Sequence, residues 1–186
     1  MTRLVGDLLD ITRIARGKIQ LQPERIELGE LVQRTIEDHR TELLASGCDL
    51  EVAVAEEALW VDVDATRIAQ VIGNLLQNAA KFTPRGGKIA VSLGREHDAA
   101  SLRVRDSGIG IAADMLQKIF EPFTQADNSL DRSLGGLGLG LALVKGLVEM
   151  HGGSVSATSE GVGKGATFVL SLPLAAQESP RAAGEA

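Results

Sequence analysis

The order of the predicted elements indicates an α+β fold, a two-layer α/β sandwich in which helices cover one face of a mixed sheet. Helical and strand-like patterns occur in groups, namely helices, strands, a helix, strands, helices and strands, and not in the regular alternation of a parallel nucleotide-binding sheet. Apolar residues make up 44% and charged residues 24% of the 186 residues, which is an ordinary globular composition. Because the sequence has neither a run of 18 apolar residues nor a signal-peptide pattern, we expect a cytoplasmic chain, even if its parent is membrane-anchored.

Two helices are predicted in the first part of the chain. Residues 1–16 repeat apolar side chains at the spacing of a bundle seam, and Gly17 and Pro23 end this helix. A second helix is expected from Leu28 to Ala45, ended by Gly47. Because the first helix is too short and too amphipathic to be stable alone, we expect it to be half of a helical pairing.

The central helix begins after the N-cap residue Asp64 and ends before Pro84. A short helix is expected around Ala113–Ile119, then a polar loop from Thr124 to Ser133, and then a helix from about Gly140 to Met150. Short apolar or alternating runs predict the strands Leu50–Val54, Leu59–Val63, Lys88–Leu93, Ser101–Arg105, Ser154–Thr158 and Ala166–Leu172.

The central helix has an unusual polar face. Gln70, Asn74, Asn78 and Lys81 follow one another in steps of four, four and three residues, so they share one side. Asparagine is a poor helix former, but its carbonyl oxygen is a ligand that Mg²⁺ accepts together with waters and phosphate oxygens. Lys81 is placed to meet an anion. The alternative interpretation is an amide-rich face exposed to solvent.

Two glycine-containing loops suggest a phosphate and a base site. The glycines of residues 135–140 precede a helix, where close backbone N–H groups and the helix dipole favour phosphate. Asp106 ends a strand before two glycines, and a carboxylate there can accept from an exocyclic amine and so distinguish adenine from guanine. A flexible hinge and a plain turn are the respective alternatives.

Several other functions are disfavoured. A net charge of −6 and 3% aromatic residues argue against a nucleic-acid partner. The lone Cys48 and the scattered His39, His97 and His151 offer no disulfide and no metal-ligand spacing. The sequence contains no P-loop motif, and residues 108–113 match a dinucleotide fingerprint without the acidic strand that should follow.

With these pieces, the chain resembles the catalytic and ATP-binding domain of sensor histidine kinases, in the GHKL superfamily with its Bergerat fold. The four signature boxes and a closing motif occur in the family's order. They are the N box (residues 70–83), the first glycine box (106–110), the F box (120–123), the second glycine box (136–140) and the motif at 163–168.

The resemblance implies ATP and Mg²⁺ as cofactors and a role for each box. Asn74 would hold Mg²⁺ between the phosphates, with Asn78 beside the nucleotide and Lys81 paired with phosphate. Asp106 would accept from the adenine amino group, supported through water by Thr167. The other residues implied to contact the nucleotide are Phe82, Gly108, Gly110, Ile111, Phe123, Arg132, Gly136, Leu137, Gly138, Leu139 and Gly140.

Two departures from the family pattern matter for catalysis, which the resemblance assigns to Gln70, Asn74, Lys81 and Arg132. Many relatives begin the N box with Glu, a candidate general base, whereas Gln70 can orient a nucleophile but cannot take its proton. The family's phosphoacceptor histidine, near the start of the first dimerisation helix, is absent from this sequence. We therefore expect ATP binding without autophosphorylation.

The resemblance covers roughly residues 1–174 and divides the chain in three. Residues 1–22 would be the end of the dimerisation helix with its linker, residues 23–174 the catalytic domain, and residues 175–186 a tail or linker. The implied partners are the phosphoacceptor histidine of a dimerisation domain and the receiver domain of a response regulator. We expect a homodimeric parent and a monomer for this chain. The alternatives are a GHKL ATPase, a serine-directed anti-sigma kinase and a non-catalytic nucleotide-binding module, of which the F box and the helix remnant disfavour the first two.

Overall fold

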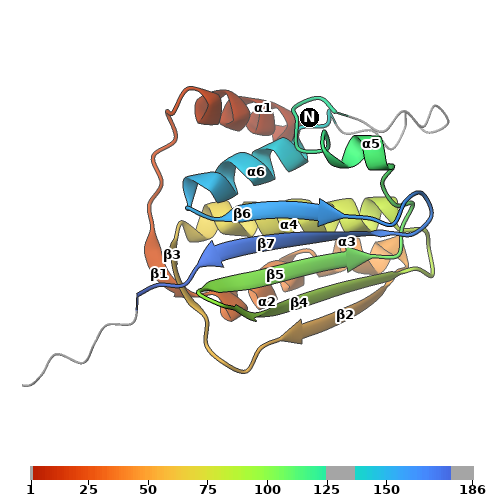
Figure 1. Ribbon diagram of the computed structural model, residues 1–186, viewed down its shortest axis with the longest axis horizontal. Coiled ribbons are helices and arrows are strands. Elements are labelled where there is room, and N and C mark those ends of the chain that lie inside the picture. Colours follow the sequence, from red (N-terminus) through yellow and green to blue (C-terminus); the bar gives the residue numbers. More distant parts are fainter. Residues whose placement is uncertain (1, 125–136, 177–186) are drawn as a thin grey trace, which may run out of the picture.

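A five-stranded mixed sheet forms one layer of the molecule (Figure 1). In sheet order its strands are β2 (Asp49–Val54), β4 (Lys88–Glu96), β5 (Ala99–Asp106), β7 (Ala166–Pro173) and β6 (Ser154–Thr158). β2 runs parallel to β4, and every other neighbouring pair is antiparallel. This computed structural model describes residues 2–124 and 137–176.

Helices form the second layer. They are α1 (Thr2–Ala15), α2 (Leu28–Asp38), α3 (Arg40–Ser46), α4 (Ala65–Phe82), α5 (Ala113–Leu116) and α6 (Gly140–Met150). In Figure 1, α2, α3 and α4 lie behind the sheet, α6 lies next to β6, and α1 packs on the outside of α6. Alternate residues of β4 and β7 are buried against these helices, which is the pattern of a sheet with one covered face. The predicted two-layer α+β sandwich is confirmed.

The central helix α4 forms the middle of the core. Its side chains Ile68, Ile72, Leu75 and Leu76 are fully buried. As predicted, Asp64 is the N-cap, and its side chain accepts a hydrogen bond from the Arg67 N–H at 3.1 Å. None of the helices in residues 2–124 and 137–176 is long and apolar enough to span a membrane.

Two local predictions were wrong. The helix expected from Leu28 to Ala45 breaks at His39 into α2 and α3. The imidazole of His39 packs against Gly73 of α4, where an added Cβ would lie 2.8 Å from the ring, so a tertiary contact fixes the break. The helical pattern of the sequence continues through this position and gives no sign of the contact.

The second error is a missed strand. β1 (Glu24–Glu27) pairs antiparallel with β3 (Trp60–Val63) in a separate two-stranded sheet. β1 has a single apolar residue, Ile26, so hydrophobic alternation could not identify it. Glu27 ends β1 and at once caps α2, because its carboxylate accepts from the Gly29 and Glu30 N–H groups.

Candidate functional site

The end of α4, the loop after β5 and the start of α6 meet at one place. The Ile109 N–H donates to the Phe82 carbonyl at 3.0 Å, which joins the first glycine box to the end of α4. A Cβ added to Gly140, the first residue of α6, would lie 3.7 Å from the Asn74 Oδ1. Segments that are far apart in the sequence therefore form one site.

Asp106 is the buried carboxylate of this site. It is the last residue of β5 and is 7% exposed. Its Oδ1 accepts from the Gly108 N–H at 2.8 Å and from the Ala166 N–H at 3.3 Å. Within the described residues both hydrogen bonds of the carboxylate go to Oδ1, which leaves Oδ2 to accept from a ligand. Burial raises the pKa of Asp106 above its ordinary value, and the two N–H donors lower it in part.

The glycines around Asp106 allow backbone to pack on backbone. Gly110 has a φ of 70°, and a Cβ there would lie 2.0 Å from the Gly161 carbonyl oxygen. Gly165 has a φ of 69°, and a Cβ there would lie 2.1 Å from the Asp106 carbonyl oxygen. Both positions exclude a side chain for conformational and steric reasons. The first glycine box is thus held against the loop between β6 and β7.

Ser159 braces this loop and was not identified from the sequence. Its Oγ accepts from the Ile111 N–H at 3.0 Å and donates to the Gly165 carbonyl at 2.6 Å. The same loop donates from the Gly163 N–H to the Ile109 carbonyl at 2.6 Å. A serine in a polar loop is too common for sequence reasoning to have assigned this role.

The polar face of α4 contributes three of the predicted residues. Asn74 is 7% exposed, and Asn78 and Lys81 are half-buried. The Lys81 Nζ lies 4.6 Å from the centre of the Phe82 ring, and the residue Phe82 is 40% exposed. Burial lowers the pKa of the Lys81 amine, which means that its ammonium form lacks part of its normal solvation. A phosphate nearby would restore that stabilisation.

Gln70 shares this helix but its amide is bonded elsewhere. Its Oε1 accepts from the Arg67 Nη1 at 3.0 Å, and its Nε2 donates to the Asp10 Oδ2 of α1 at 3.3 Å. Both contacts are on the side of α4 that faces α1. The structure therefore places Gln70 one turn before Asn74 but in contact with another helix.

Thr167 is not brought to the site. It pairs with Arg105 in the β5–β7 ladder, whereas Asp106 pairs with Ala166. Successive side chains of a strand point to opposite faces, so Thr167 lies on the face of the sheet away from Asp106. The position beside the carboxylate belongs to Ala166, one residue earlier, and the expected support of Asp106 by Thr167 is therefore corrected.

The F box and the second glycine box lie side by side. Phe123 has a φ of 65° and is 63% exposed, and its N–H donates to the Gly138 carbonyl at 3.1 Å. Leu137 is exposed, whereas Leu139, the N-cap residue of α6, is 2% exposed. Arg132 and Gly136 lie outside the described residues.

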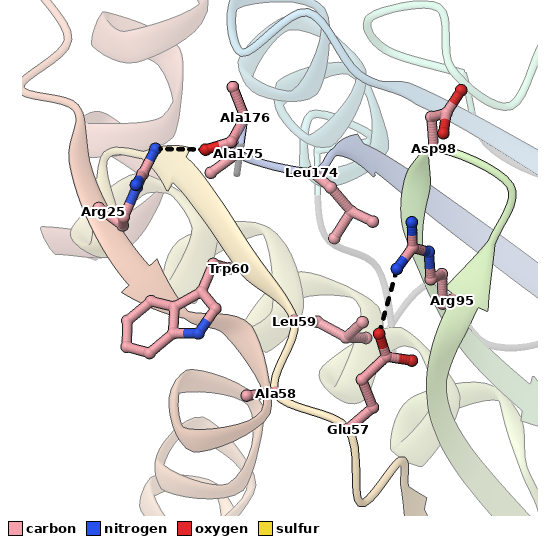
Figure 2. A pocket seen from close by; sticks show the side chains of 10 residues that line it. All are labelled: Arg25, Glu57, Ala58, Leu59, Trp60, Arg95, Asp98, Leu174, Ala175 and Ala176. Atoms are coloured by element: carbon pink, nitrogen blue, oxygen red, sulfur yellow. Dashed lines mark hydrogen bonds and ion pairs between the residues drawn. The ribbon is translucent and has the colours of Figure 1, made fainter. Parts of the chain in front are cut away.

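A hollow of about 690 Å³ lies at the end of β5 opposite Asp106 (Figure 2). Trp60, Leu59 and Leu174 line it, together with the ion pair between Arg95 and Glu57 at 3.1 Å. None of the residues predicted from the signature boxes lines it. The candidate nucleotide site and this hollow are therefore separate.

Comparison with known proteins agrees with the geometry. Residues 63–176 match the family of histidine kinase-, DNA gyrase B-, and HSP90-like ATPases. The circadian input-output histidine kinase CikA of Synechococcus elongatus is 37% identical over 175 residues, which cover 93% of this chain and 23% of that protein. The matched regions of three curated relatives are only 20–32% of their length, so this chain spans a third or less of each of these proteins.

Solved structures show the same fold. Full-length ShkA in complex with AMPPNP has a TM-score of 0.82 at 30% identity, covering 96% of this chain and 36% of that one. The mycobacterial sensor histidine kinase MprB has a TM-score of 0.70 at 30% identity, covering 82% of this chain and 98% of that one. The chain therefore belongs to the histidine kinase-, DNA gyrase B-, and HSP90-like ATPase family, as an ATP-binding domain of the sensor histidine kinase type.

Proposed function

We propose that this chain binds ATP with Mg²⁺ and supplies the catalytic half of a sensor histidine kinase. It would present the γ-phosphoryl group to a histidine on a dimerisation domain, from which a response regulator receiver domain would take it. The observation that carries the proposal is the buried Asp106 carboxylate, with one oxygen satisfied by the protein and the other left for a ligand. The activity would be cytoplasmic, because ATP is available there.

Asp106 fits the recognition of adenine. An acceptor at Oδ2 would pair with the exocyclic amino group of adenine, and the exposed part of Phe82 offers an apolar surface beside it. Guanine carries a carbonyl at the corresponding position, so two acceptors would face each other in a buried site. Leaving buried polar groups unpaired is the strongest form of discrimination that a pocket has.

The phosphates would lie between α4 and the start of α6. Asn78 and Lys81 would contact them from α4, and the glycines at the start of α6 would offer backbone N–H groups. No cluster of three or more His, Cys, Asp or Glu side chains that could hold a metal occurs within residues 2–124 and 137–176. A magnesium ion would therefore need amide oxygen, water and the phosphates themselves, and the shielded Asn74 beside Gly140 fits that donor set.

Catalysis would consist of positioning and charge neutralisation, as phosphoryl transfer generally requires. Mg²⁺ would neutralise phosphate charge when bound, and Lys81 would add a cation on the same side. Arg132 remains a proposed phosphate contact. The Gln70 amide is hydrogen-bonded to Asp10 and Arg67. While α1 is packed in this way, the amide would therefore not be available to orient a nucleophile.

The chain does not offer its own phosphoacceptor at this site. His39 packs on Gly73, and the His151 Nε2 accepts from the Asp64 N–H at 3.0 Å at the far end of α4. His97 lies in the turn between β4 and β5, at the opposite end of β5 from Asp106. The histidine would have to come from a separate dimerisation domain.

Replacing Asp106 by Asn tests the base recognition. The amide retains the Oδ1 acceptor but presents an N–H₂ donor to the adenine amino group. We expect AMPPNP affinity to fall about tenfold to a hundredfold, the loss typical of a hydrogen bond to a charged group. Affinity for inorganic triphosphate should change little, as measured by calorimetry. The matched control is Asp98→Asn, at the other end of β5, and equal losses for AMPPNP and triphosphate would mean that Asp106 does not contact the base.

Replacing Asn74 by Ala tests the metal role. The substitution removes the shielded amide oxygen, so Mg²⁺ should no longer strengthen AMPPNP binding, although metal-free affinity should be preserved. Titrations with Mg²⁺ and with EDTA measure the difference. Gln77→Ala is the control, since this amide of the same helix is bonded to Glu42 at 3.0 Å and faces α3. An unaltered dependence on Mg²⁺ in the Asn74 variant would remove Asn74 from the metal site.

Phosphoryl transfer to a separate histidine domain tests the kinase activity. Radiolabelled ATP and this chain should produce acid-labile labelling of an added dimerisation domain from a sensor histidine kinase, and none of the chain alone. A dimerisation domain with its phosphoacceptor histidine replaced by alanine is the control. Stable acid-labile labelling of the chain alone would refute the prediction. Nucleotide binding without transfer would favour the alternative of a nucleotide-binding module without kinase activity.

A further inference from the structure

We propose that Asp10 is a positioning residue of the nucleotide site, acting from α1 through Arg67 and Gln70. The inference rests on the proposed function and concerns how the site is held in its binding form. α1 lies outside the signature boxes, and it packs along α6 on the side away from the sheet (Figure 1). Its polar contact with α4 occurs one turn before Asn74.

Asp10, Arg67 and Gln70 form a closed set of hydrogen bonds. The Asp10 Oδ2 accepts from the Arg67 Nη1 at 2.9 Å and from the Gln70 Nε2 at 3.3 Å. The Arg67 Nη1 also donates to the Gln70 Oε1 at 3.0 Å. Each of the three side chains is therefore hydrogen-bonded to the other two. Among the described residues, removing the Asp10 carboxylate leaves Arg67 and Gln70 with one side-chain hydrogen bond, the one between them.

This ion pair is unusually shielded from solvent. The side chains of Asp10 and Arg67 are 14% and 26% exposed, whereas both partners of every other ion pair among the described residues are at least 39% exposed. Exposed pairs contribute little to stability because water and salt screen them. Among the ion pairs of the described residues, the pair of Asp10 and Arg67 is therefore the least screened by solvent and the best suited to hold one helix against another.

An apolar contact holds α1 to α6 as well. Ile14 lies so close to Gly146 that a Cβ added to the glycine would be 2.9 Å from the Ile14 Cγ2. Gly146 thus leaves room for the Ile14 side chain, which would have to shift if position 146 carried a Cβ. Together the two contacts make α1 a brace across α4 and α6.

These two helices carry the residues proposed to contact the phosphates. Asn74 follows Gln70 by one turn on α4, and Gly140 begins α6 beside Asn74. Fixing the two helices relative to each other fixes the distance between the two sides of the phosphate site. A preorganised site binds more tightly, because less ordering is required on binding. Nucleotide affinity is accordingly higher with α1 packed, and bound nucleotide in turn favours packing of α1 by the same factor.

A removable cross-link between α1 and α6 tests the inference. The Ile14 Cβ lies 3.8 Å from the position of a Cβ on Gly146, which is the mean separation in disulfides. The Ile14→Cys and Gly146→Cys substitutions, made in a Cys48→Ser background, should give a disulfide that holds α1 in place when oxidised and releases it when reduced. Asp10→Ala is added to this protein, and Asp38→Ala, an exposed acid at the end of α2, is the matched control.

Calorimetry with AMPPNP and Mg²⁺ is then performed on each oxidised and reduced protein. In the reduced state, Asp10→Ala should bind AMPPNP about fivefold or more weakly than the parent, the lower end of ordinary coupling, and Asp38→Ala should match the parent. Oxidation should restore the affinity of the Asp10→Ala protein. A general loss of folding, or a direct effect of Asp10 on the ligand, would not be repaired by a disulfide four residues away.

In a glutathione redox buffer of fixed composition, AMPPNP should also raise the fraction of the protein that is oxidised at equilibrium, which is the reciprocal effect. The inference alone would be overturned if the Asp10→Ala protein bound AMPPNP equally well in its oxidised and reduced states. This holds whether its affinity matches that of the parent in both states or is lower in both. Failure of every form to bind AMPPNP would overturn the proposed function and this inference with it.

Discussion

The burial of one carboxylate is the constraint on which the site depends. Asp106 is 7% exposed, and burial of a charged group is unfavourable unless hydrogen bonds compensate. Two backbone N–H groups do so at Oδ1, but the pKa of Asp106 remains raised. A raised carboxyl pKa favours the folded state most at low pH, and this contribution is lost as the pH rises through the folded-state pKa. The ionised form of Asp106 therefore costs stability, which a hydrogen bond from adenine would offset.

The surrounding loops are built to keep that carboxylate in place. Gly110 and Gly165 bring two backbone segments, the first glycine box and the loop between β6 and β7, into contact without side chains between them, and Ser159 ties the same segments together by hydrogen bonds. The carboxylate is thus fixed by secondary structure on one side and by close-packed loops on the other. The phosphate side has a different origin, since α4 and α6 are held together by the apolar core and braced by α1. The proposed recognition of the base and the proposed binding of the phosphates would therefore rest on separate parts of the fold.

Features encoded by local periodicity and capping could be predicted from the sequence, whereas features fixed by tertiary contacts could not. α4 was predicted with its N-cap and its polar face, because helical spacing and Asp64 are both visible in the sequence. The break at His39 depends on contact with Gly73, and the strand β1 depends on pairing with β3. The prediction for Thr167 was wrong by one position along β7, because successive residues of a strand lie on opposite faces of the sheet and Ala166 is the residue that pairs with Asp106. Arg132 lies outside the described residues, and its role stays a prediction.

Calorimetric titration of the chain with AMPPNP, with and without Mg²⁺, tests the central claim most directly, with a non-hydrolysable GTP analogue as the comparison. The account predicts that Mg²⁺ strengthens AMPPNP binding and that the GTP analogue binds far more weakly, because the Asp106 carboxylate would face a carbonyl oxygen. Equal affinity for the two nucleotides would contradict the role given to Asp106. Absence of binding to either would leave the chain with the fold of the family but without the nucleotide site proposed for it.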